Sequence, residues 1–317
     1  MSRIRSIAHL TLLDLEPPAL VATAAAAGFD RVGIRVSPAS AGEQGYSIRP
    51  RSLMLRDTLL ALDDHGMRVL DVEAMRVDAR SSRDQWMTTL EVGAALGAQV
   101  LNVIGADEDL DRFADTFAVL AADSEGFGIR ASLEPISYCP LRTVAQARDI
   151  IARAGRGGIM LDTLHFVRAG QAVSDLRDLP EGTISVVQIS DGPATPPTDI
   201  PIPAMVPLGQ ALDGTPRQQE SRIRRLLPGD GVFPLHDILR ALPDDVPVSV
   251  EVPDVQRVAR EGARRWAESA FVAMASTLEG SARISKAVKR SSLLTTDIRP
   301  DRLTNGREEC SAQSEAK

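Results

Sequence analysis

The stretch from residue 128 to residue 162, GIRASLEPISYCPLRTVAQARDIIARAGRGGIMLD, contains one full repeat of the pattern that decides the fold. A short apolar run typical of a buried strand (128–134) leads into a longer segment with helical spacing (143–154). A second apolar run (158–162) follows it. Strands that alternate with helices in this way form parallel βαβ units. The stretch therefore predicts a parallel sheet covered by helices.

The same unit recurs along the whole chain, and eight pairs of strand and helix are predicted. Several helices end at a glycine directly before the next strand, as in AAAAGF, LDDHGM, AALGAQ and SEGFGI, which is typical of a left-handed helix cap. The remaining strands are predicted at 4–12, 31–36, 67–74, 99–105, 183–189 and 247–252. The remaining helices are predicted at about 17–28, 52–65, 84–97, 109–124, 165–177, 234–242 and 256–279.

Eight parallel units with right-handed crossovers close most naturally into a single (β/α)8 barrel, a fold of the α/β class. An open, doubly wound sheet is the alternative. Such a sheet is expected to carry a glycine-rich phosphate-binding sequence after its first strand, and HLTLLDLEPP stands there instead. The sequence therefore favours the barrel.

Two segments depart from the repeat. Residues 193–220 form a long Pro-rich loop after the seventh strand, which we interpret either as a lid over the barrel mouth or as a disordered insert. Residues 281–317 are polar and lack an apolar period, so we expect a disordered tail. The predicted organisation is one barrel domain, residues 1–280, followed by this tail.

Composition limits the class of partner. The 317 residues carry a net charge of −7 and only 3% are aromatic, which argues against a nucleic-acid binder. No apolar run is long enough for a membrane span, and the N-terminus lacks the pattern of a signal peptide. The two cysteines, Cys139 and Cys310, lie far apart, as suits a reducing compartment. We expect a cytoplasmic protein that binds a small molecule rather than nucleic acid or a membrane.

An oxygen-bearing side chain closes each of the last four predicted strands. These residues are Glu134 in SLEP, Asp162 in MLDTLH, Gln188 in VVQISD and Glu251 in VSVEVP. One such carboxylate is commonly a helix cap or half of an ion pair, but the carboxyl ends of barrel strands converge on one cavity. Together the four provide an all-oxygen ligand set, which suits Mn²⁺ or Mg²⁺ better than zinc.

In this order, SLEP, LDTLHF, VVQISDGP, RLLPGDG and VSVEVP resemble the xylose isomerase-like TIM barrels, the superfamily of sugar phosphate isomerases and epimerases. The resemblance covers about residues 4–279 and is strongest from 128 to 253. It implies a divalent metal, with Co²⁺ as a further candidate beside Mn²⁺ and Mg²⁺. The ligands that it implies are Glu134, Asp162, Gln188 and Glu251, of which the two glutamates double as catalytic acid and base.

The resemblance also implies that His165 and Arg225 hold substrate oxygens. His9, at the end of the first strand, and Asp191, after the seventh, lie near the same predicted mouth. We expect both to contact the substrate, with a structural role as the alternative for His9 and the orientation of a ligand as the alternative for Asp191. Relatives often pair, so the resemblance further implies a homodimer.

Gln188 departs from the family pattern, because most relatives carry histidine there. A glutamine in this context, together with LRDLP at 176–180, is similar to bacterial 3-dehydroshikimate dehydratases of the same superfamily. We predict a metal-dependent sugar (phosphate) isomerase or epimerase that abstracts a proton next to a carbonyl of a polyhydroxylated substrate, through a metal-stabilised enediolate. The alternatives are a dehydratase-like lyase, which shares this first step, and a non-catalytic or partner-dependent barrel subunit.

Overall fold

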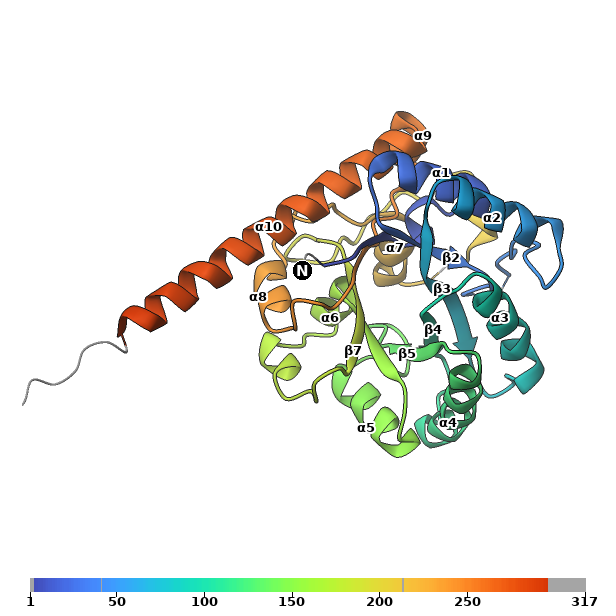
Figure 1. The fold of residues 1–317 in the computed structure, drawn as a ribbon, viewed down its shortest axis with the longest axis horizontal. Coiled ribbons are helices and arrows are strands. Elements are labelled where there is room, and N and C mark those ends of the chain that lie inside the picture. The colour runs from blue at the N-terminus through green and yellow to red at the C-terminus, as the bar shows by residue number, and fades with distance from the viewer. Residues whose placement is uncertain (1–2, 41, 213, 296–317) are drawn as a thin grey trace, which may run out of the picture. The chain divides into compact units, whose positions relative to one another are not determined.

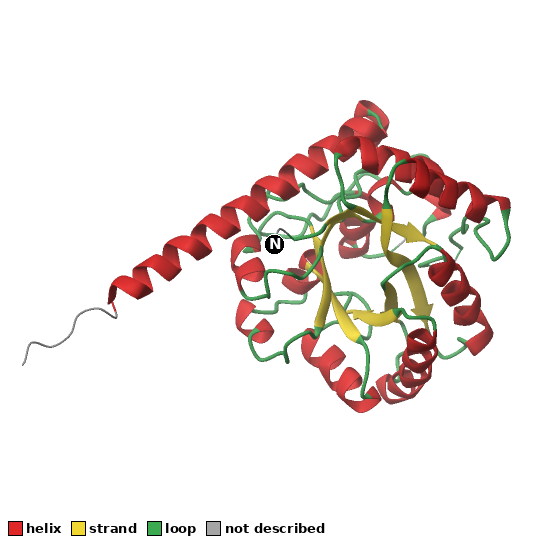
Figure 2. Cartoon of the chain, in the orientation of Figure 1, coloured by secondary structure: helices red, strands yellow, loops and turns green. Residues whose placement is uncertain are grey.

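The computed structural model describes residues 3–40, 42–212 and 214–295, and side-chain burial as far as residue 284. Eight parallel strands form a closed barrel in which each strand pairs with the next along the chain and β8 pairs with β1 (Figures 1 and 2). The strands are β1 Arg5–Ile7, β2 Arg31–Arg35, β3 Arg68–Val77, β4 Val100–Gly105, β5 Arg130–Glu134, β6 Gly158–Asp162, β7 Ile184–Ile189 and β8 Val248–Val250. The predicted (β/α)8 barrel is confirmed.

Helices surround the strands, as Figure 2 shows in red around yellow. The helices of the described chain are α1 Pro17–Ala27, α2 Leu53–Asp64, α3 Arg83–Ala95, α4 Leu110–Gly126, α5 Val144–Ala154, α6 Thr163–Arg168, α7 Pro216–Ile223, α8 Leu235–Arg240, α9 Val255–Glu261 and α10 Ala263–Thr295. Three short 3-10 helices, η1 His9–Leu12, η2 Val173–Leu176 and η3 Pro207–Gly209, complete the described elements. The predicted glycine caps are confirmed, for example at Gly28, where φ is 95°.

The inside of the barrel is apolar at one end and polar at the other. Leu70, Val100, Met160 and Val186 come from four different strands and form one buried cluster, which the closed topology places inside the barrel. Nearer the carboxyl ends of the strands, the lack of a side chain at Gly33 leaves space for the carboxylates of Glu73 and Asp71. A Cβ added there would lie 2.7 Å from Glu73 Oε1 and 3.1 Å from Asp71 Oδ1.

Three predicted elements differ from those observed. The first strand ends at Ile7, and 9–12 form η1, because the His9 amide donates to the Glu73 carboxylate (2.7 Å) instead of to a neighbouring strand. The predicted helix 165–177 is split into α6 and η2, with Gly170 at φ 72° between them. The predicted helix 256–279 is likewise divided by Gly262, where φ is 86°.

The Pro-rich segment and the predicted tail contain more helix than expected. η3 and the first part of α7 lie within 193–220. α10 continues to Thr295, so residues 281–295 of the predicted tail are helical; they contain no Gly or Pro and are rich in good helix formers. The rest of the predicted tail, 296–317, lies outside the described residues. The chain divides into two compact units, Met1–Ser281 and Ala282–Lys317.

No helix in the described part of the chain is both long enough and apolar enough to cross a membrane.

Candidate functional site

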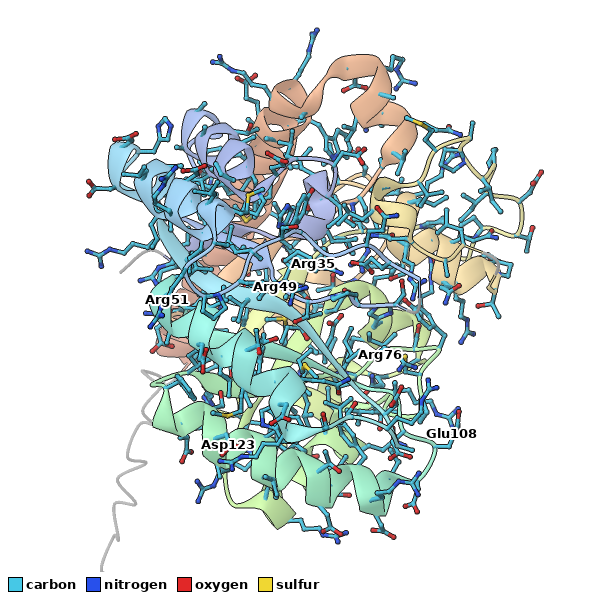
Figure 3. All side chains as sticks on the ribbon, turned by 90° about the vertical axis from the view of Figure 1, so that its right-hand side faces the viewer. Arg35, Arg49, Arg51, Arg76, Glu108 and Asp123 are labelled. Atoms are coloured by element: carbon cyan, nitrogen blue, oxygen red, sulfur yellow. The ribbon has the colours of Figure 1, made fainter. Side chains whose placement is uncertain are left out.

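A cavity of about 270 Å³ opens at the carboxyl ends of the barrel strands. Glu134 at the end of β5 and Glu251 directly after β8 line it, so strand ends that are far apart in the sequence meet in one place. Arg76 and Glu108, both labelled in Figure 3, line it on the side of β3 and β4. The segment after β7 contributes Gln210, Gln218, Ser221, Arg222 and Arg225. The segment predicted as a lid therefore borders the mouth of the barrel.

Glu134, Asp162 and His165 form a compact group of buried metal-ligating side chains. One ligand atom from each lies within 4.8 Å of the other two. His165 Nε2 is 3.9 Å from Glu134 Oε1 and 3.9 Å from Asp162 Oδ2. Carboxylate and imidazole atoms gathered in this way suit a divalent transition-metal ion. The residues present therefore fit the metal that the sequence resemblance implies, with His165 among the donors.

Gln188 and Glu251, the other two predicted ligands, are hydrogen-bonded to each other. Gln188 lies beside Asp162 in the register of β6 and β7, and its Nε2 donates to Glu251 Oε1 (2.9 Å). Among the described residues, Gln188 Oε1 has no partner although it is buried. An unpartnered amide oxygen is a ligand atom that suits a hard cation. The ligand roles of Gln188 and Glu251 stay predictions.

Arg225 lies between the carboxylates at the buried end of the cavity. Its Nη1 donates to Asp162 Oδ2 (2.7 Å), and its Nη2 forms an ion pair with Glu251 Oε2 (2.9 Å). The other N–H groups donate to the Ser221 carbonyl and hydroxyl and to the Glu251 carbonyl. Each of the three guanidinium nitrogens thus has a hydrogen-bond partner inside the protein. Arg225 therefore positions the carboxylates, and the expectation that it holds substrate oxygens stays a prediction.

Burial and charge separate the protonation states of these groups. Burial, reinforced by the Asp162 carboxylate, raises the pKa of Glu134 to about 7. Burial also raises the pKa of Glu251 well above its ordinary value, although Arg225 opposes the shift. Burial acts on Asp162 too, but the Arg225 guanidinium holds the pKa of that carboxyl below its ordinary value. Burial lowers the pKa of His165 to about 4, so its imidazole is neutral, which is the form that binds a cation.

Sequence reasoning missed three polar residues that hold the site in place. Asn102 Nδ2 donates to Glu134 Oε2 (2.7 Å), and a polar residue inside the apolar run QVLNVIG was the feature that could have revealed it. Ser137 Oγ lies 3.3 Å from His165 Nδ1, and Ser221 Oγ lies 3.2 Å from His165 Nε2. Neither serine stands out in the sequence.

His9 is held by structural contacts on both sides of its ring. Its Nε2 donates to the Leu15 carbonyl (2.8 Å), and its Nδ1 accepts from the Arg35 amide (2.8 Å). The ring stacks on Tyr46, with centroids 5.3 Å apart. Both nitrogens are therefore occupied, and burial lowers the pKa of His9 to about 3. The expectation of a substrate contact is corrected in favour of the structural alternative.

Asp191 holds a turn rather than a substrate. Its carboxylate accepts hydrogen bonds from the backbone amides of Gly192 (2.8 Å), Gly229 (3.0 Å) and Phe233 (2.9 Å). Asp191 also forms a backbone bridge with Leu226, next to Arg225. The expectation of a substrate contact is corrected here too, because Asp191 fixes the PGDG turn that follows Arg225.

A closed (β/α)8 barrel with ionisable side chains gathered at the carboxyl ends of its strands has the architecture of TIM-barrel enzymes. The sequence model of the xylose isomerase-like TIM barrel family matches residues 21–270. The chain belongs to this family. No curated protein sequence matches it significantly.

Solved structures show the same fold at low identity. A xylose isomerase-like TIM barrel/4-hydroxyphenylpyruvate dioxygenase fusion protein aligns with a TM-score of 0.68 and 21% identity over 95% of this chain, which spans 46% of the fusion. The IOLI protein with a bound zinc atom aligns with a TM-score of 0.66 and 18% identity, over 89% of this chain and 99% of the other. D-allulose 3-epimerase from Methylomonas sp., in complex with D-allulose, aligns with a TM-score of 0.60 and 14% identity, over 87% of this chain and 97% of the other.

Proposed function

We propose that this protein is a divalent-metal-dependent isomerase or epimerase of a sugar or sugar phosphate. The observation that supports this most is the pairing of Glu134 and Glu251, two buried carboxyls with raised pKa values, in one cavity with the group that can hold a metal. Two carboxyls that can each give or take a proton are what a proton transfer between neighbouring carbons requires. The D-allulose 3-epimerase of the same fold acts on a substrate of this class.

The two glutamates divide the proton transfer between them. The ionised one takes a proton from the carbon next to the substrate carbonyl, and the protonated one returns a proton to the neighbouring carbon or to the opposite face. The first outcome, with an accompanying shift of a hydroxyl proton, is isomerisation, and the second is epimerisation. Asn102 orients Glu134, whereas Gln188 and Arg225 orient Glu251. Each glutamate is thus fixed by its own donors.

A divalent cation would be held by Glu134, Asp162 and His165, with Gln188 Oε1 as a further ligand atom. When bound, it would polarise the substrate carbonyl and so acidify the neighbouring C–H group. We propose Mn²⁺ ahead of Mg²⁺, and Co²⁺ as a third candidate, because a histidine nitrogen suits Mn²⁺ and Co²⁺ better than Mg²⁺, which prefers oxygen.

One observation favours a second candidate, a dehydratase-like lyase. Gln188 departs from the histidine that the sequence resemblance implies at this position, and its amide donates to Glu251 Oε1. In a lyase the same first proton abstraction is followed by loss of a β-hydroxyl group as water, which leaves an enone.

The test combines metal content with isotope exchange. Protein loaded with Mn²⁺ and desalted is analysed for bound metal, then incubated in D₂O with a panel of ketoses, their phosphates and 3-dehydroshikimate. Glu251→Gln tests the site, and Glu91→Gln, at an exposed position of α3, is the matched control. Deuterium in a ketose without loss of water supports the isomerase, and a new enone absorbance supports the lyase. If the wild-type protein binds no metal, and if Glu251→Gln behaves like wild type in both assays, both proposed functions are refuted.

A further inference from the structure

One face of α7 lines the cavity from its buried end to its outer part. Gln218, Ser221, Arg222 and Arg225 all belong to the lining, and their spacing places them on one side of the helix and its continuation. Arg225 is fully buried, whereas Arg222 and Gln218 are half-buried. This face therefore presents a row of polar groups to whatever occupies the cavity.

The inner end of this face has no free hydrogen-bond donor for an anion. Every guanidinium nitrogen of Arg225 has a partner inside the protein, and the Ser221 hydroxyl lies within hydrogen-bonding distance of His165 Nε2 and Arg225 Nη2. Glu134 and Glu251 line the cavity at this depth, and whichever of them is ionised repels an anion. An anionic group of a substrate would therefore avoid the inner end of the cavity.

The outer end is different because of Arg222. Its Nη1 donates to the Ala211 carbonyl, and no described carboxylate forms an ion pair with it. The other lining arginines are paired, as Arg35 is with Glu43 (2.9 Å) and Arg76 with Asp78 (2.6 Å). Within the described part of the chain, Arg222 thus offers an uncompensated positive charge to the cavity.

Two side-chain amides accompany this charge. Gln218 precedes Arg222 by one helical turn, and Gln210 is adjacent to Ala211, the partner of Arg222. Both glutamines line the cavity, and their buried amide oxygens lack a partner among the described residues. A free amide oxygen accepts a hydrogen bond from a hydroxyl group, so these residues suit the hydroxyl groups of a polyhydroxylated molecule.

We propose that Arg222 binds an anionic group of the substrate, a carboxylate or a phosphate, at the end farthest from the reacting carbon, while Gln210 and Gln218 accept hydrogen bonds from the neighbouring hydroxyl groups. A guanidinium matches either group through two parallel hydrogen bonds. The inference rests on the proposed function, since it assigns a substrate class to the same cavity. The class is a polyhydroxylated carbonyl compound with one acidic end.

The experiment compares three unreactive probes that share a polyol chain: D-sorbitol, D-sorbitol 6-phosphate and D-gluconate. Their affinities for the full-length, metal-free protein are measured by isothermal titration calorimetry. At least one charged probe is expected to bind about 10- to 100-fold more tightly than sorbitol, as a charged hydrogen-bonded pair contributes. The charged probe with the larger gain in affinity over sorbitol shows whether the site prefers a phosphate or a carboxylate.

Variants locate the effect. Arg222→Gln should abolish the preference for charge, and Arg222→Lys should keep part of it. Arg224→Gln is the matched control, because Arg224 is exposed, lies two positions further along the chain and is not among the described residues that line the cavity. This control should leave the preference intact. Circular dichroism checks that each variant is folded.

Two results would overturn the inference: charged probes that bind no better than sorbitol, or a preference for charge that survives Arg222→Gln. Because the probes neither react nor need a metal, this outcome is independent of the test of the proposed function. If the wild-type protein binds no metal and catalyses no isotope exchange but still prefers the charged probes, the proposed function alone is refuted.

Discussion

The buried ion pair between Arg168 of α6 and Glu220 of α7 links the stability of the barrel to the geometry of the site. Arg168 Nε donates to Glu220 Oε2 (2.8 Å) and Nη2 to Oε1 (2.6 Å), and the two side chains are only 4% and 2% exposed. The guanidinium also donates to the Pro193 carbonyl and lies 4.9 Å from the centre of the Phe233 ring. The pair therefore fastens α7, which carries Ser221 and Arg222, to the barrel.

Glu220→Gln leaves the Arg168 cation buried without a counter-charge. Removing one partner of a buried pair costs about 3–5 kcal/mol of unfolding free energy, which corresponds to a fall in Tm of roughly 6–20 °C. The double variant Arg168→Met with Glu220→Met removes both charges and should recover most of that loss, because apolar replacements of buried pairs are often close to neutral.

Urea unfolding followed by circular dichroism measures these differences. Glu125→Gln is the matched control, because Glu125 pairs with Arg156 (2.8 Å) at the surface and should cost less than about 1 kcal/mol. A cost for Glu220→Gln no larger than that of Glu125→Gln would refute the reasoning, and so would a double variant less stable than either single one.

Three further predictions concern the inside of the barrel. Burial, with the Glu73 carboxylate beside it, raises the pKa of Asp71 well above its ordinary value, and neither carboxylate oxygen has a described partner. Because the folded state binds a proton that the unfolded state releases, the folded protein loses stability as pH rises. The free energy of unfolding of Asp71→Asn, measured in urea, should therefore equal that of wild type near pH 4 and exceed it increasingly toward pH 8. A difference between the two proteins that does not change with pH would contradict this. Gln188→His should tighten Mn²⁺ binding by roughly tenfold in calorimetry, because imidazole is the better ligand, and unchanged affinity would place Gln188 outside the metal site. Gly33→Ala should cost about 1–3 kcal/mol in thermal unfolding, because the new Cβ would lie 2.7 Å from Glu73 Oε1, and a neutral result would show that this acid moves freely.

Local patterns in the sequence predicted the barrel and the place of its site. The run 158–162 coincides with β6, and Gly28 ends its helix as expected, because strand burial and helix capping depend on residues close in the chain. Parallel strands bring their carboxyl ends to one mouth, so Glu134 and Glu251 could be placed in one cavity from their positions alone.

Only the tertiary structure decided which partner each polar group has. Arg225 lies in a segment far from Asp162 along the chain, yet it occupies the space between that carboxylate and Glu251. Asn102 reaches Glu134 because β4 and β5 are neighbours in register, and His9 bonds to Leu15 instead of to a substrate. Such contacts depend on the stagger of the closed barrel and on the path of the segment after β7. Neither is encoded in the spacing of residues along a single strand or helix, so the sequence could place these groups near the mouth but could not assign their bonds.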